Sequence, residues 1–139
     1  MQIRPFQNFD EESVVDLWAR CGLLRSWNDP HKDIARKLLV QPELFLVGVI
    51  DEQVMATIMA GFEGHRGWIN YLAVDPRWQR QGYGRRLMDE VERCLCDRNC
   101  PKINLQIRHD NLDAIKFYKR LGFIQDAAVS FGKRLVQDD

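Results

Sequence analysis

The chain has 139 residues, and its 20 lysines and arginines balance 20 aspartates and glutamates, so its net charge at pH 7 is zero. This balance excludes a global field that would draw nucleic acid or an anionic membrane to the protein, and no apolar run approaches the ~20 residues that cross a bilayer. The N-terminus lacks the apolar stretch of a signal peptide, so we expect one cytoplasmic domain over residues 1–139, with no nucleic-acid or membrane partner.

The N-terminal third predicts a strand followed by two helices. Gln2 to Phe6 has the length and composition of a short strand. Asp10 is suited to cap the first helix, and Gly22 is placed to end it. Asp29-Pro30 would open the second helix, because proline fits the first helical position.

The middle of the chain predicts three consecutive strands. Leu44 to Ile50 is a dense apolar run, Val54 to Phe62 is its partner, and Trp68 to Val74 completes an antiparallel meander. The turn at Asp51-Glu52-Gln53 lacks the glycine that is typical of a tight hairpin.

Helices and strands then alternate. A polar loop leads into a third helix around residues 87–95, a strand from Ile103 to Ile107 follows, and Asn111 can cap a fourth helix. Gly122 would end that helix, and Phe123 to Leu135 would supply one or two last strands. The order predicts an α/β fold: one mixed, mostly antiparallel sheet of six to seven strands, flanked by about four helices.

The loop before the third helix carries the strongest functional signal. Gly82 and Gly84 lie where a strand end leads into a helix start, and backbone N–H groups at such a start are unpaired and carry partial positive charge. Glycines let those groups approach a phosphate or pyrophosphate closely. The loop is not a Rossmann fingerprint, because Leu87 stands where a third glycine belongs, and it lacks the G-K-[ST] of a P-loop. A plain helix start with surface arginines is the remaining alternative.

Two motifs resemble those of the GNAT superfamily of N-acetyltransferases. Gln79-x-x-Gly82-x-Gly84 resembles its Q/R-x-x-G-x-G/A signature, and the block from Asn111 to Phe123 resembles its second hallmark. The order of elements agrees from end to end, and the stretch from Leu24 to Pro30 is similar to small bacterial members of the YpeA type.

The resemblance implies acetyl-CoA as co-substrate, with its pyrophosphate on the glycine loop and its pantetheine arm beside the fourth strand. The cofactor-binding residues that it implies are Leu72, Ala73, Val74, Gln79, Arg80, Gln81, Gly82, Tyr83, Gly84, Arg85, Asn111 and Tyr118.

The resemblance also implies how acetyl transfer would be assisted. The backbone N–H of Leu72 would stabilise the oxyanion, and Tyr118 would act as general acid toward the leaving sulfur. Many family members carry a glutamate on the fourth strand, but Trp68 to Val74 contains no acid. Glu63, in the preceding turn, is the candidate base, with a water relay at Asn70 and Tyr71 or His65 as alternatives.

The acceptor is left open: a small-molecule amine, or a peptide or protein amine. A second hypothesis is an acyl-CoA-binding sensor or interaction module without turnover, which the missing acid favours. The chain could act as a monomer or homodimer. Its four cysteines form no C-x-x-C pair and no histidine pair lies near them, so we expect no metal site.

Overall fold

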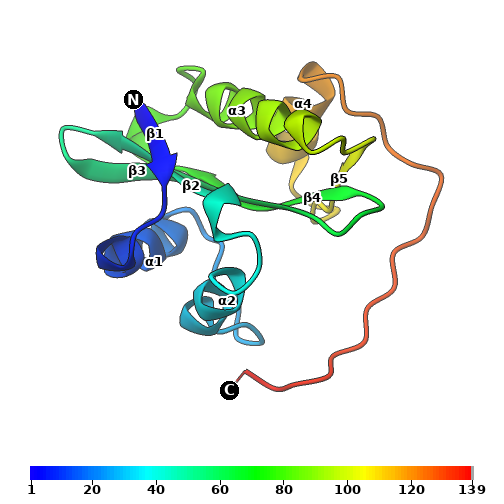
Figure 1. Cartoon of the computed structure of the whole chain (residues 1–139), viewed down its shortest axis with the longest axis horizontal. Helices are drawn as coiled ribbons and strands as arrows, with labels where there is room; N and C mark the ends of the chain where they lie inside the picture. Colours follow the sequence, from blue (N-terminus) through cyan, green and yellow to red (C-terminus); the bar gives the residue numbers. More distant parts are fainter. Residues whose placement is uncertain (139) are drawn as a thin grey trace.

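A computed structural model describes residues 1–138 as one five-stranded sheet with helices on both faces (Figure 1). The strands, in sheet order, are β1 (Gln2–Pro5), β2 (Phe45–Ile50), β3 (Gln53–Phe62), β4 (Gly67–Val74) and β5 (Ile103–Leu105). The helices are α1 (Glu11–Arg20), α2 (Pro30–Lys37), α3 (Tyr83–Asp97) and α4 (Leu112–Arg120), with short 3₁₀ turns at Asn8–Asp10, Pro42–Leu44 and Pro76–Trp78. The sheet separates α1 and α2 from α3 and α4.

Each face of the sheet has its own apolar core. On the α3 and α4 face, Leu87 and Met88 of α3 pack against Ile58 of β3. On the α1 and α2 face, Trp18 of α1 packs against Phe45 of β2, with ring centroids 6.3 Å apart. The expected mixed α/β architecture with four helices is therefore confirmed.

Two predicted helix starts have different outcomes. Asp29 caps α2, because its Oδ1 accepts the backbone N–H of His31 at 2.8 Å, and Pro30 is the first helical residue, as predicted. Asp10 precedes α1, but its carboxylate makes no cap bond to that helix. It accepts the backbone N–H of Gln7 at 2.8 Å and pairs with Arg4, which ties α1 to β1.

The strand count differs from the expected six to seven. Within residues 1–138 the sheet has five strands, and the segment from Phe123 to Leu135 contains none. Asp126 bonds Lys102 and Asn104 beside β5, whereas Asp138 bonds Arg36 on α2. The segment starts beside β5 and its continuation reaches α2 at Asp138, so it stretches along the side of the molecule and forms no strand with β5 (Figure 1).

β4 and β5 are paired over only part of their length. They run parallel, as predicted, with partners from Gly67 with Ile103 to Ile69 with Leu105. β5 ends at Leu105, two residues earlier than expected, while β4 continues to Val74. The C-terminal half of β4 therefore has no β5 residue beside it.

A bulge lies in that unpaired half of β4. Thr57 on β3 is opposite Ala73, and Met59 is opposite Asn70, so Tyr71 and Leu72 together face one residue of β3. Tyr71 has a φ of 52°, a conformation uncommon for a residue with a side chain. The bulge changes the direction of the β4 backbone just beyond the point where pairing with β5 ends.

Candidate active site

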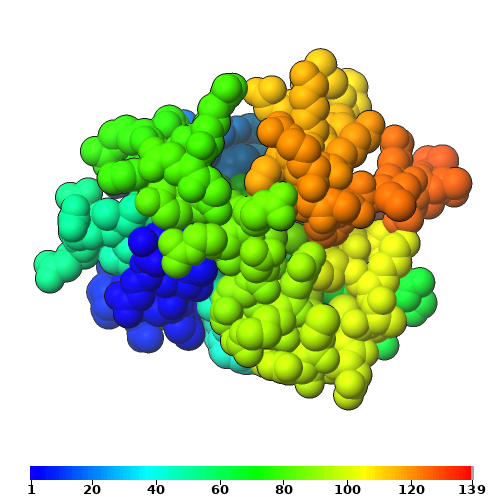
Figure 2. Space-filling view, turned by 90° about the horizontal axis from the view of Figure 1, so that it is seen from above, coloured from blue at the N-terminus to red at the C-terminus, as the bar shows by residue number. Residues whose placement is uncertain are grey.

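The start of α3 has the character of an anion site. Gly82 is the N-cap, with φ 84°, and no side chain caps the helix. The first turn contains no acidic residue, whereas the exposed Arg80 and Arg85 flank it. A Cβ built on Gly82 meets no atom within 4 Å, so the surface beside this glycine is open. Figure 2 shows a hollow between this loop and α4.

The two glycines of the loop differ in their local conformation and packing. Gly82 adopts the positive φ that side chains resist. Gly84 lies inside α3, and a Cβ there would come within 3.1 Å of the Phe117 ring and 3.9 Å of Val74. Its lack of a side chain therefore lets α3 pack closely against α4 at the end of β4.

Buried polar contacts fix the loop to the end of β4. Asp75 is 2% exposed, and its carboxylate accepts the backbone N–H of Arg77 at 3.0 Å and pairs with Arg20 at 2.9 Å. Burial opposes ionisation of Asp75, but these donors outweigh it and lower its pKa. The Gln79 amide donates to the carbonyl of Val74 at 2.9 Å. Gln79, predicted to contact the cofactor, thus holds the loop through its side chain.

The bulge is clamped by a buried hydrogen-bond chain. Trp18 Nε1 donates to Thr57 Oγ1 at 2.9 Å, and Thr57 Oγ1 donates to the carbonyl of Tyr71 at 2.8 Å. The Tyr71 ring stacks on Trp18 with centroids 3.8 Å apart, and its hydroxyl donates to Asp33 at 2.7 Å. The backbone next to Leu72 is therefore fixed by two contacts of Tyr71: its carbonyl binds Thr57 of β3, and its hydroxyl binds Asp33 of α2.

Tyr118 lies on α4 and faces a groove. Its ring packs edge-to-face against Phe117 and Phe123, with centroids 5.0 and 5.5 Å away. Burial raises its pKa to about 12. Its hydroxyl makes no hydrogen bond to another residue of the described chain, and Tyr118 lines a groove together with Asn70 of β4 and Leu105 of β5. The groove therefore joins Tyr118 to the point where β5 ends beside β4, whereas Leu72, Ala73 and Val74 are not among its lining residues.

Two other predicted site residues, Asn111 and Glu63, make hydrogen bonds to the backbone of their own segments. Asn111 caps α4, because its Oδ1 accepts the backbone N–H of Ala114 at 3.2 Å. Glu63 lies in the turn before β4, where its carboxylate accepts the backbone N–H groups of His65 and Arg66. These hydrogen bonds lower the pKa of Glu63, and Glu63 does not line the groove. The structure does not bring Glu63 together with Tyr118.

Sequence reasoning missed two residues next to the bulge. Thr57 is fully buried within the apolar run of β3, and a hydroxyl residue in such a run signals a buried partner. Asp33 lies on α2, and its contact with Tyr71 spans 38 positions of the chain. No local pattern marks a contact of that kind.

Comparison with known proteins places the chain in a family. The chain matches the model of the acetyltransferase (GNAT) family over residues 11–123. An acetyltransferase of Sodalis glossinidius (strain morsitans) is 46% identical over 139 residues, covering 99% of this chain and 98% of that protein.

Two solved structures share the fold. The ribosomal-protein-S18-alanine N-acetyltransferase of Escherichia coli has a TM-score of 0.75 at 24% identity, covering 90% of this chain and 78% of that chain. The PaiA N-acetyltransferase of Thermoplasma acidophilum, in complex with coenzyme A, has a TM-score of 0.81 at 16% identity, covering 92% of each chain. Because the family model spans most of the chain and the Sodalis protein is similar along its whole length, the chain belongs to the acetyltransferase (GNAT) family.

Proposed function

We propose that the protein transfers the acetyl group of acetyl-CoA to an amine by direct attack within a ternary complex. The observation that carries the proposal is the split in the sheet: β4 continues from Asn70 to Val74 without β5 beside it and bulges at Tyr71 and Leu72. A split of this kind leaves backbone groups of β4 open to a second extended molecule, which would add to the sheet as a strand does.

The residues around the split fit coenzyme A. The pantetheine arm would lie along Leu72 to Val74, next to Asn111, whose amide nitrogen is the donor left after its oxygen caps α4. The pyrophosphate would lie on the N–H groups from Gly82 to Arg85, in the open space over Gly82. Arg80 would add a cationic donor there.

The chemistry then needs few groups. Holding the amine and the thioester in line removes much of the entropic barrier. The backbone N–H of Leu72, fixed by the clamped bulge, would stabilise the developing oxyanion. The Tyr118 hydroxyl would donate a hydrogen bond to the departing sulfur. Because the Glu63 carboxylate is engaged in its own turn, the amine proton would leave through water in the groove beside Asn70.

The second hypothesis, an acyl-CoA-binding module without turnover, has one observation in its favour: β4 carries no acid. Titration calorimetry with acetyl-CoA and with NAD tests binding, and release of free thiol in the presence of a panel of amines and peptides tests transfer. We expect saturable binding of acetyl-CoA, no binding of NAD, and amine-dependent thiol release. Binding of acetyl-CoA with no release for any amine would support the module, and binding of NAD alone would contradict both.

Replacing Gly82 with valine should weaken acetyl-CoA binding about tenfold or more, because the side chain enters the space over the helix N-terminus and displaces charge-assisted hydrogen bonds. Valine at φ 84° also strains the backbone and should cost about 1–2 kcal/mol of stability. Thermal melts with and without acetyl-CoA measure both effects.

Gly64→Val is the matched control. Gly64 also has a positive φ, of 103°, and no atom within 4 Å of an added Cβ, but it lies in the turn before β4. The control should lose similar stability and keep the full ligand-induced rise in melting temperature. A Gly82→Val protein that also keeps the full rise would exclude this loop as the phosphate site.

A further inference from the structure

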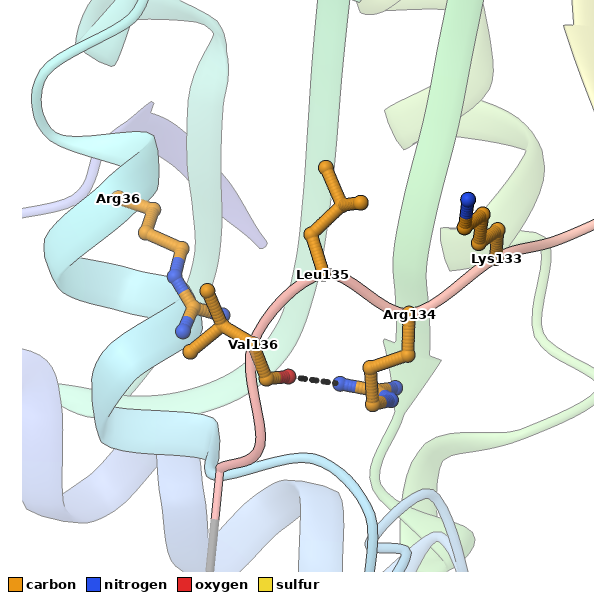
Figure 3. A pocket seen from close by; sticks show the side chains of 5 residues that line it. All are labelled: Arg36, Lys133, Arg134, Leu135 and Val136. Carbon is orange, nitrogen blue, oxygen red and sulfur yellow. Dashed lines mark hydrogen bonds between the residues drawn. The ribbon is translucent and has the colours of Figure 1, made fainter.

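A basic pocket lies on the α1 and α2 side of the molecule, away from the α3 N-terminus. Arg36 reaches from α2 toward the C-terminal segment, which contributes Lys133, Arg134, Leu135 and Val136 (Figure 3). Three of the five lining residues are cations. Arg134 Nη2 also donates to Asn28 Oδ1 at 3.0 Å, so the pocket adjoins the loop that precedes α2.

This corner already holds a carboxylate of the chain itself. The Asp138 side chain accepts both Nη atoms of Arg36, at 2.6 and 3.2 Å, and the backbone N–H of Asp29 at 3.1 Å. The hydrogen bonds from Arg36 lower the pKa of Asp138 to about 2. The corner therefore binds a carboxylate with the two-pronged geometry that arginine offers.

Arg36 is neutralised by that contact, so the remaining positive charge comes from its neighbours. Within residues 1–138, Lys133 and Arg134 form no ion pair with a carboxylate. Arg108 adds a further cation beside the same loop, with its guanidinium 5.1 Å from the centre of the Trp27 ring. An anionic group entering this corner would find exposed cationic donors.

Direct contacts join the pocket to the bulge. The Tyr71 hydroxyl binds Asp33, and Arg36, one turn further along α2, pairs with Asp33 at 3.2 Å. Asp33 and Arg36 are about 4.5 Å apart along the helix axis, and the tyrosine side chain adds its own length. An extended peptide advances about 3.4 Å per residue. With the length of their own side chains added, acidic second and third residues would approach the pocket from an amine at the bulge.

We infer that the acceptor is an amine that carries carboxylates two to three residues from its amino nitrogen, as an acidic peptide N-terminus does. The inference rests on the proposed transfer to an amine and adds the class of acceptor. The amine would enter from the α1 and α2 side and meet the thioester at the bulge. Lys133 and Arg134 would hold the acidic side chains, and a polycationic acceptor would be repelled.

The test uses three C-terminally amidated peptides that differ only in charge: Ala-Glu-Glu, Ala-Gln-Gln and Ala-Lys-Lys. For the full chain we expect kcat/KM to be about tenfold higher with the acidic peptide than with the neutral one, since each partly exposed ion pair contributes only modestly. The basic peptide should be the poorest. Raising the ionic strength to about 1 M should remove most of the preference.

Single substitutions test whether Lys133 and Arg134 cause the preference for the acidic peptide. Lys133→Gln and Arg134→Gln should each lower kcat/KM for Ala-Glu-Glu about threefold and leave Ala-Gln-Gln within twofold, and Arg134→Lys should keep most of the preference. Arg66→Gln, in the turn before β4, is the charge-matched control and should change neither. An Arg134→Gln protein that loses activity equally with all three peptides would show that its bond to Asn28 only supports the fold, and would contradict the inference.

A parallel titration separates this inference from the proposed function. The same peptides are titrated by calorimetry into protein saturated with coenzyme A. Tighter binding of the acidic peptide without any thiol release would remove the proposed transfer and retain the acidic-ligand site. Thiol release with no difference among the three peptides would retain the transfer and overturn the inference.

Discussion

Replacing Tyr118 with phenylalanine is expected to lower kcat about 100-fold while leaving acetyl-CoA affinity within about threefold. The ring keeps its contacts with Phe117 and Phe123, so packing on α4 is preserved. The hydroxyl makes no hydrogen bond to another described residue, so its loss should also change stability by less than about 0.5 kcal/mol. Initial rates of thiol release and one denaturation curve measure both effects.

The pH dependence shows how the hydroxyl works. Burial raises the pKa of Tyr118 to about 12, so the group stays protonated throughout the usual assay range, whereas an unshifted tyrosine would ionise near pH 10. Transfer of its proton to a thiolate with a pKa of about 8.5 is uphill by about 3.5 units, or roughly 5 kcal/mol. We therefore expect Tyr118 to act as a hydrogen-bond donor, which narrows the general-acid role expected from the sequence.

A hydrogen-bond donor predicts a constant ratio of wild-type to Tyr118→Phe rates from pH 7 to about pH 10. A ratio that shrinks above the thiol pKa would instead indicate full proton transfer, because the thiolate then leaves unaided. Unchanged rates at every pH would remove Tyr118 from the reaction and leave it as a core residue.

Local patterns in the sequence predicted most of the fold. The cap at Asp29, the proline after it and the apolar periodicity of α3 are encoded within one or two turns of helix, so they could be recognised without tertiary contacts. The segment from Phe123 to Leu135 could not be placed in this way. Its course depends on ion pairs with Lys102 and Arg36, which lie 24 and 102 positions from their partners in the chain.

The candidate site also contains parts that local sequence predicts and parts that depend on contacts between distant residues. The glycine loop is contiguous, so its position at the start of α3 followed from the motif. A backbone donor at Leu72 was expected from the family resemblance, but the clamp on the adjacent bulge joins Trp18, Thr57 and Asp33 from three separate elements. Hydrogen bonds between distant elements leave no periodic signal, so only the buried hydroxyl in an apolar strand could have indicated them.

Replacing Thr57 with valine is expected to lower kcat about tenfold and to destabilise the fold by about 3 kcal/mol. Valine has nearly the same shape, but it leaves Trp18 Nε1 and the carbonyl of Tyr71 without their buried partner, and each unpaired group costs about 1–3 kcal/mol. The bulge would then be held through the Tyr71 side chain alone, by its stacking on Trp18 and its bond to Asp33.

The loss of turnover follows from the position of Leu72 next to that carbonyl. Removing an oxyanion donor from an active site typically costs about 100-fold or more in kcat, so a donor that is only displaced should cost less, about tenfold. Acetyl-CoA affinity should change less than threefold, because the loop at Gly82 does not contact Thr57. Steady-state kinetics with acetyl-CoA and one amine, together with a denaturation curve, give these values.

Thr57→Ser separates the hydroxyl from the methyl group. Serine keeps the donor to Tyr71 and the acceptor for Trp18 but deletes a buried methyl, which should cost about 1 kcal/mol of stability. If the clamp positions the Leu72 N–H, the serine variant should recover most of the wild-type kcat although it remains less stable, whereas valine should lower both. Equal kcat for the serine, valine and wild-type proteins, with stability falling only in the variants, would mean that the clamp supports the fold and that Leu72 needs no such positioning.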